Sequence, residues 1–124
     1  MTHRDLHPND LILIYGDIKI VERVDRTHIA TRGPHDSLEL WAYSEQIQPI
    51  EITNKLVMKS LGFYEENNTL KYDIDSKEII IDDKGRCYIP YSADGYTAIF
   101  SVEYLHEVQQ HYFHVLDKEL KFDI

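Results

Sequence analysis

The sequence predicts an α+β fold: a bent antiparallel sheet, or small partial barrel, with one short helix and one longer C-terminal helix. Three observations predict it. Short apolar runs with period two recur through the chain, turn residues separate them, and the stretch 101–117 has an unbroken helical period. The length of 124 residues and the hydrophobic fraction of 43% also fit a domain with a true core rather than a disordered chain.

The N-terminal part is expected to hold a tail followed by strands. Residues 1–9 are polar, so we expect a flexible tail there and a single α+β domain over residues 10–124. Alternating apolar residues bounded by turn residues then predict strands at residues 11–15, 18–24, 27–31 and 38–43. Gly, Pro and Asp make residues 33–37 a predicted loop.

A short helix is expected at about residues 53–62. Pro49 disfavours helix just before it, so residues 47–52 are expected to be extended. Thr53 is a good N-cap for the helix. Gly62 stands where a left-handed C-cap falls, and Phe63 can close that end by packing back onto the helix.

The rest of the chain is expected to form a meander of strands and then the longer helix. Strands are expected at residues 69–74, 78–81, 86–91 and 96–100, after a turn at residues 65–68. The helix is expected over about residues 101–117, with Ser101 as its cap, because apolar residues recur at three- and four-residue steps. This stripe is expected to pack on the sheet and consists of Leu105, Val108, Tyr112 and Leu116.

Charge and composition limit the function classes. The chain has 13 basic and 22 acidic residues, and its net charge of -9 divides into -2 over residues 1–62 and -7 over residues 63–124. Such a surface repels phosphate backbones, so direct binding of nucleic acid is not expected. The more acidic half, residues 63–124, either aids solubility or docks onto a basic surface of a protein partner. A single cysteine fits a reducing, cytosolic setting, and the lack of a long apolar run predicts a soluble protein.

Three histidines in the predicted C-terminal helix raise the question of a metal site. His106 and Glu107 precede a second histidine, His111, but the two histidines are five residues apart and roughly 140° around a helix. They cannot chelate one metal together. His111 with His114, or Glu107 with His111, has usable spacing, yet further ligands are not indicated. No metal or other cofactor is expected.

The other possible catalytic residues lack the surroundings that catalysis needs. Cys87, in the strand-like RCYIP, is more typical of a small buried residue than of a nucleophile. Ser37 lacks the GxSxG pattern that exposes a catalytic serine. Two pairs of acidic residues could suggest a cation-binding loop: Asp73 with Asp75, and Asp82 with Asp83. Neither pair follows the twelve-residue EF-hand pattern. We therefore expect no catalytic residues and no enzyme.

A protein-binding surface is the remaining expectation. The chain has nine tyrosines, and aromatic residues with polar tips are enriched at interfaces, although they can also fill a small core. The polar face of the C-terminal helix and the acidic turns before it are the expected contact regions. The candidate partner-binding residues are Glu103, Glu107, Gln110, His111, His114, Asp82, Asp83 and Asp94.

Two stretches of the chain resemble sequence patterns of one protein family. Residues 47–63, IQPIEITNKLVMKSLGF, resemble its pIpLTeeiLlkcGF pattern. Residues 102–122, VEYLHEVQQHYFHVLDKELKF, resemble its YvHqLQnlyfaLtgkEL pattern, although Val108 stands where the family has Leu. These patterns are those of small, uncharacterised proteins associated with phages and prophages of Bacteroidetes. The resemblance therefore implies a phage accessory protein in the cytoplasm of a bacterial host cell. It carries over no site residue, because the family has no established activity.

Three functions follow as hypotheses. The first is a non-enzymatic phage or prophage protein that inhibits a host defence effector, as anti-CRISPR proteins do, by placing its acidic surface on a nucleic-acid-handling protein. The second is a structural or assembly module of a prophage. The third, and least favoured, is a small metal-dependent or cysteine enzyme that uses His111, His114 or Cys87.

Overall fold

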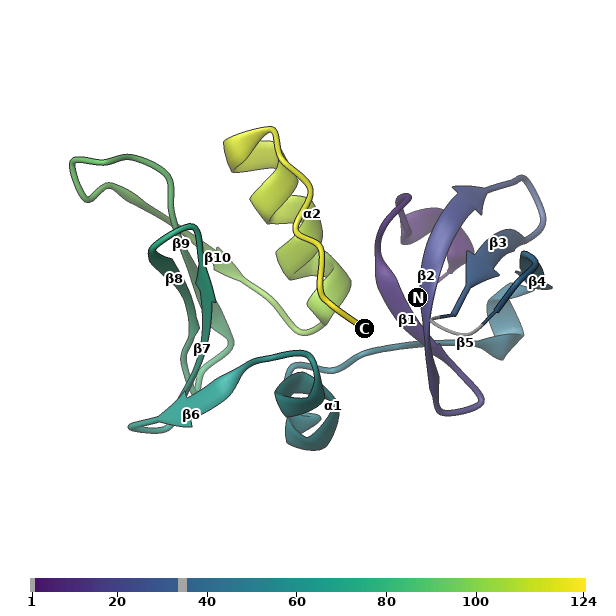
Figure 1. Cartoon of the computed structure of the whole chain (residues 1–124), viewed down its shortest axis with the longest axis horizontal. Coiled ribbons are helices and arrows are strands. Elements are labelled where there is room, and N and C mark those ends of the chain that lie inside the picture. The colour runs from purple at the N-terminus through teal and green to yellow at the C-terminus, as the bar shows by residue number, and fades with distance from the viewer. Residues whose placement is uncertain (1, 34–35) are drawn as a thin grey trace. The chain divides into compact units, whose positions relative to one another are not determined.

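A computed structural model describes residues 2–33 and 36–124, so two residues of the predicted loop at 33–37 lie outside the described part. The chain forms two compact units, residues 1–50 (unit 1) and residues 51–124 (unit 2) (Figure 1). The mixed α+β class is confirmed. The single domain expected over residues 10–124 stays a prediction, because it depends on whether the two units unfold together. No helix within the described residues is long and apolar enough to cross a membrane.

Unit 1 is a five-stranded antiparallel sheet with the order β4-β3-β2-β1-β5. Its strands are β1 (Leu11–Ile14), β2 (Asp17–Val24), β3 (Ile29–Arg32), β4 (Leu40–Ala42) and β5 (Ile47–Pro49). The pairing of β2 with β3 shifts register between Val21 and Arg23, and such a shift bends a sheet. The buried core consists of Leu6, Ile12, Val21, Ile29, Ala42 and Ile47.

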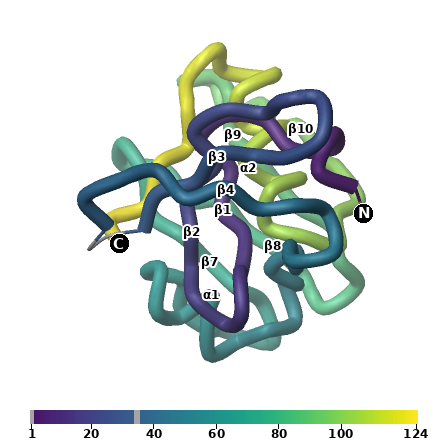
Figure 2. Tube along the Cα trace, turned by 90° about the vertical axis from the view of Figure 1, so that its right-hand side faces the viewer, coloured from purple at the N-terminus to yellow at the C-terminus, as the bar shows by residue number. Residues whose placement is uncertain are grey.

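The β1–β2 hairpin illustrates why these residues turn where they do (Figure 2). Its turn is Tyr15-Gly16, one residue earlier than residues 16–17, which separate the predicted strands 11–15 and 18–24, and both turn residues have positive φ, at 50° and 85°. A turn with two left-handed residues has the twist that joins two adjacent strands tightly. The local signal therefore located the hairpin but missed its register by one residue.

The first residues of the chain, where a flexible tail is expected, make contacts within unit 1. Whether this stretch is flexible stays a prediction. Residues 3–5 form a 3-10 turn (His3–Asp5), and Leu6 is only 2% exposed. The His3 ring is also buried: Nδ1 lies 2.6 Å from the Ser44 hydroxyl, and Nε2 lies 3.1 Å from the carbonyl oxygen of Asp25. All these partners are distant in the chain. A polar stretch read locally cannot show that one of its side chains has such partners.

Unit 2 contains a second antiparallel sheet with the sequential order β10-β9-β8-β7-β6. The strands are β6 (Tyr64–Glu66), β7 (Thr69–Ile74), β8 (Lys77–Ile81), β9 (Arg86–Pro90) and β10 (Thr97–Ser101). The predicted meander is confirmed, but β6 was missed. Glu65 and Glu66 belong to that strand, and the turn is Asn67-Asn68, whose φ angles are 53° and 63°. Asparagine tolerates this left-handed conformation better than most residues.

The short helix α1 (Lys55–Ser60) has both ends marked by side chains and glycine. Its N-cap is Asn54 rather than Thr53, because the Asn54 side-chain oxygen accepts a hydrogen bond from the backbone N–H of Val57. At the other end, Gly62 has a φ of 109°, and the N–H of Phe63 donates to the carbonyl of Met58. This is the Schellman geometry, so the predicted role of Gly62 is confirmed.

The long helix α2 (Leu105–Leu116) lies beside the sheet of unit 2 and starts later than predicted (Figure 1). Ser101 does not cap it, because Ser101 pairs with Arg86 as the last residue of β10. Instead the Glu107 carboxylate accepts hydrogen bonds from the backbone N–H groups of Glu103 (2.8 Å) and Tyr104 (2.9 Å). The predicted stripe faces the core: Leu105, Val108 and Tyr112 are buried and Leu116 is half-buried.

The residues after α2 return to the core of unit 2, which the sequence did not indicate. Leu120 is fully buried, and its carbonyl accepts a hydrogen bond of 3.2 Å from the buried Gln109 side chain. Phe122 packs against two aromatic rings of the same unit, with centroid distances of 4.9 Å to Tyr72 and 5.8 Å to Phe63. A segment without helix or strand thus completes the core.

Candidate partner-binding surface

Unit 2 contains a cleft of about 610 Å³. It is lined by the start of the unit at residues 51–55, by the region around the β6–β7 turn, by the β8–β9 turn at residues 82–85 and by residues 102–104. Buried apolar side chains contribute to its lining, and these are Ile52, Leu70, Ile81 and Val102. The rest of the lining is largely polar or charged.

Backbone hydrogen bonds bring these distant segments together. Glu51 and Tyr104 form an isolated antiparallel bridge, and the Ile52 N–H donates to the Glu103 carbonyl at 3.0 Å. The Val102 N–H donates to the Gly85 carbonyl at 2.8 Å, which ties the β8–β9 turn to the same strip of chain. Gly85 has a φ of 78°, and a Cβ there would lie 2.9 Å from the Val102 carbonyl oxygen. Glycine is therefore required at this corner of the cleft.

Asp82, one of the predicted partner-binding residues, is engaged inside the β8–β9 turn. Its carboxylate accepts hydrogen bonds from the N–H groups of Lys84 and Arg86, from the Arg86 guanidinium (2.8 Å) and from the Tyr88 hydroxyl (3.0 Å). These donors, with the backbone N–H of Arg86 first, lower the pKa of Asp82 to about 2. Its acceptor sites are thus occupied within the fold.

We expect the Asp82 network to make unit 2 sensitive to acid. The folded carboxylate stays ionised down to about pH 2, whereas its ordinary value is 3.8, so the unfolded chain binds the proton first. The stability from this group is therefore present above about pH 4 and is lost as the pH falls towards 2. Urea unfolding followed by circular dichroism between pH 6 and pH 2 should show a lower midpoint at pH 6 and a weaker pH dependence in Asp82→Asn. The exposed neighbour substitution Asp83→Asn is the control, and equal pH profiles for Asp82→Asn and the wild type would refute the assignment.

Three other carboxylates of the cleft are free to meet a partner. The exposed side chains of Glu51, Asp83 and Glu103 make no side-chain hydrogen bond or ion pair within the described residues. In contrast, Glu65 is paired with Lys55 at 3.0 Å, and this pairing lowers the Glu65 pKa. The structure thus brings Asp82, Asp83 and Glu103 of the predicted set into one cleft and adds Tyr104, one of the tyrosines, and Glu51, which no local pattern distinguished.

The remaining predicted residues do not line this cleft. Glu107 caps the start of α2, and Gln110 is half-buried and interacts within the fold. His111 stacks on Phe100, with ring centroids 4.0 Å apart, and partial burial lowers its pKa although the nearby Glu107 opposes the shift. His114 and Asp94 are exposed. Whether these five residues bind a partner stays a prediction, but they do not form one cleft with Asp83 and Glu103.

The groups considered for catalysis are also located. Cys87 is fully buried, and burial raises the pKa of its thiol to about 12, so it is a poor nucleophile near neutral pH. His106 is buried, and its ring lies 5.6 Å from the Tyr104 ring in a stacked arrangement. Within residues 2–33 and 36–124, no group of three or more His, Cys, Asp or Glu side chains is positioned to hold a metal ion.

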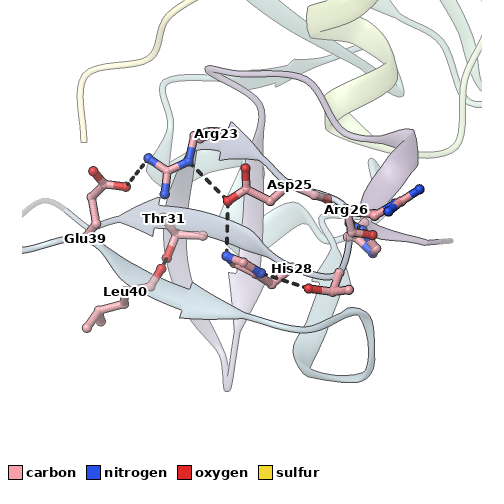
Figure 3. A network of polar contacts seen from close by, with 9 residues as sticks. Arg23, Asp25, Arg26, His28, Thr31, Glu39 and Leu40 are labelled. Atoms are coloured by element: carbon pink, nitrogen blue, oxygen red, sulfur yellow. Dashed lines mark hydrogen bonds and ion pairs between the residues drawn. The ribbon is translucent and has the colours of Figure 1, made fainter.

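Unit 1 has a different polar cluster beside an exposed apolar edge. Figure 3 shows Asp25 between Arg23 (3.2 Å) and His28 (3.1 Å), with Glu39 on the far side of Arg23. The His28 ring also stacks on Trp41 at a centroid distance of 4.5 Å. Large apolar side chains stay exposed along and beside the edge strand β4, and these are Leu38, Leu40, Trp41 and Tyr43.

Comparison with known proteins gives no match: no family model, no curated protein and no solved structure matches the chain. The resemblance of residues 47–63 and 102–122 to phage-associated proteins therefore stays a prediction.

Proposed function

We propose that this protein is a non-enzymatic binding protein of a phage or prophage. It acts in the cytoplasm of the bacterial host by covering the basic surface of a nucleic-acid-handling defence effector, in the manner of anti-CRISPR proteins. The observation that carries this proposal is the cleft of unit 2, where the exposed carboxylates of Glu51, Asp83 and Glu103 make no side-chain hydrogen bond or ion pair within the described residues. Exposed carboxylates next to apolar lining residues are complementary in charge to a basic protein surface.

The charge of unit 2 supports the same partner class. Residues 51–124 contain 14 acidic and 8 basic residues, which is a net charge of -6, whereas residues 1–50 have a net charge of -3. Complementary charge speeds association and rejects partners of the same sign. A protein surface that handles nucleic acid must present Lys and Arg to phosphates, so the same surface attracts the acidic unit.

The phage or prophage origin in this proposal rests on the sequence resemblance at residues 47–63 and 102–122. Such proteins act within the host cell, where defence effectors that bind DNA or RNA are accessible targets. Competition for a phosphate-binding surface needs no catalytic residue, which suits a chain whose only cysteine is buried.

The test joins capture with a functional measurement. The protein is used to capture partners from a host lysate, and each captured partner is purified and assayed for binding of labelled DNA and RNA with and without excess of this protein. We expect at least one partner to lose nucleic-acid binding, with an effect that weakens as salt is raised. Partners that keep full binding and nuclease activity at saturation would overturn the proposal, and so would direct binding of nucleic acid by this protein.

An assembly module is the second candidate function. The observation that favours it is the exposed apolar set around β4, since exposed sheet edges with apolar side chains favour association. Light scattering at several concentrations distinguishes the two functions, because an assembly module forms a stable homo-oligomer. A monomer at all concentrations would argue against this second candidate.

A further inference from the structure

We propose that the cleft of unit 2 binds an extended basic segment of a partner protein and holds an Arg or Lys side chain beside Asp83 and Glu103. The inference deepens the proposed function and rests on it for the partner class, but the cleft chemistry is argued from unit 2 alone. It commits the cleft to a peptide rather than to a metal ion, a nucleotide or a lipid.

The charge of the cleft lining favours a cationic ligand. Five carboxylates and two lysines line it, a net charge of -3. One of these lysines, Lys55, is already paired with Glu65, and Asp82 is occupied by donors of its own turn. Besides these pairs, the lining holds one lysine, Lys84, and three carboxylates: Glu51, Asp83 and Glu103. Asp83 is also attracted by the nearby Arg86 guanidinium, so Glu51 and Glu103 add most to the excess of negative charge. This excess repels phosphates and carboxylates and attracts guanidinium or ammonium groups.

The apolar part of the lining selects an amino-acid side chain over a small inorganic cation. Arg and Lys have long aliphatic stems that gain from contact with apolar surface while their charged ends remain near water or carboxylates. The buried side chains of Ile52, Leu70 and Val102 provide such a surface in the cleft lining. Tyr104 adds an aromatic ring to the same lining, and a cation over an aromatic face is attracted by its quadrupole.

The size of the cleft indicates a segment rather than one side chain. Its volume of about 610 Å³ lies within the range of about 300–1,000 Å³ that is typical of ligand sites. A single Arg side chain would leave much of this volume to water. A segment with a basic residue and apolar neighbours would contact the apolar lining residues and pair with the carboxylates at the same time.

The probe is a fluorescein-labelled peptide of eight residues in which Arg and Leu alternate. Its control has citrulline at each Arg position, which keeps the shape of the side chain and removes the charge. Binding to the whole protein is measured by fluorescence anisotropy at low salt and at about 0.15 M salt, where the Debye length is about 8 Å. Amide chemical shifts of labelled protein identify the residues that the peptide contacts.

Two double variants separate the cleft from the overall charge. Asp83→Asn with Glu103→Gln removes two carboxylates of the cleft, whereas Glu119→Gln with Asp123→Asn removes two exposed carboxylates that do not line it. Both variants change the net charge equally. We expect the cleft variant to weaken peptide binding about tenfold or more and the control variant to weaken it less than about twofold. Thermal melting shows that both variants are folded.

Several results would overturn the inference. These are an equal loss of peptide affinity in both double variants, equal affinity for the arginine and citrulline peptides, the absence of saturable peptide binding, or amide chemical-shift changes only outside the cleft. The two proposals also fail separately. If the cleft variant loses the peptide but still blocks nucleic-acid binding by a captured partner, the cleft is not the surface that serves the proposed function. If the peptide binds in the cleft while no nucleic-acid-handling partner is found, the proposed function fails and the cleft chemistry stands.

Discussion

Leu105→Asp is expected to unfold unit 2. Leu105 is fully buried at the start of α2, where the helix meets the core. The substitution loses the buried leucine side chain, at about 2–5 kcal/mol, and in addition buries a carboxyl group without a partner, at about 1–3 kcal/mol or more. The sum is comparable with the whole stability of a small domain, about 5–15 kcal/mol.

The measurement also tests the prediction of a single domain. Far-UV circular dichroism reports both units, whereas the fluorescence of Trp41, the one tryptophan of the chain, reports unit 1. If both signals are lost in Leu105→Asp, the chain unfolds as one domain. If only the dichroism decreases, unit 1 folds alone. The matched control is Phe113→Asp on the exposed face of the same helix, which should cost at most about 1 kcal/mol. Wild-type melting of Leu105→Asp would show that α2 is wrongly located.

Leu120→Ala is expected to lower the free energy of unfolding of unit 2 by about 2–5 kcal/mol. Leu120 lies in a segment without regular secondary structure, yet its side chain is fully buried and its carbonyl accepts a hydrogen bond from Gln109. Truncation to Ala leaves a cavity beneath the segment that also carries Phe122. The last residues should consequently loosen, which exposes Phe63 and Tyr72.

Urea unfolding at pH 7, followed by tyrosine fluorescence and circular dichroism, measures the loss. Lys121→Ala is the control, because Lys121 is exposed in the same segment and its substitution should change the unfolding free energy by less than about 0.5 kcal/mol. Equal midpoints for Leu120→Ala and Lys121→Ala would mean that the C-terminal segment does not pack on the core in solution.

The predictions that succeeded concern signals carried by neighbouring residues. Gly62 ends α1 with a positive φ, as its place after an apolar turn of helix indicated. The strand at residues 69–74 was located to the residue, since its alternation and its turns are both local. The predictions that were wrong concern residues whose type fits two different local structures. Ser101 is a good helix cap by type, yet it pairs in β10, and that pairing decided the matter.

The eight candidate binding residues have polar or charged side chains, which are common on protein surfaces. Residue type alone does not show which of them lie close together in the folded chain. Asp83 and Glu103 line one cleft because backbone hydrogen bonds join Val102 to Gly85 and Ile52 to Glu103. His111, equally polar, stacks on Phe100 instead. The sequence around Glu51 gives no sign that it lines the cleft, since its bridge to Tyr104 and the hydrogen bond from Ile52 to Glu103 position it there.

The sequence by itself determined the α+β class, the acidic charge, most of the strands and the C-terminal ends of the two helices, but not where the helices begin. These properties depend on residue types and on periods of two and 3.6 residues, which act over a few neighbours. The tertiary structure alone decided that His3, Leu6 and Leu120 are buried and that the exposed carboxylates of three residues, Glu51, Asp83 and Glu103, line one cleft. Those outcomes depend on hydrogen bonds and packing between residues far apart in the chain, and a local pattern contains no record of such contacts.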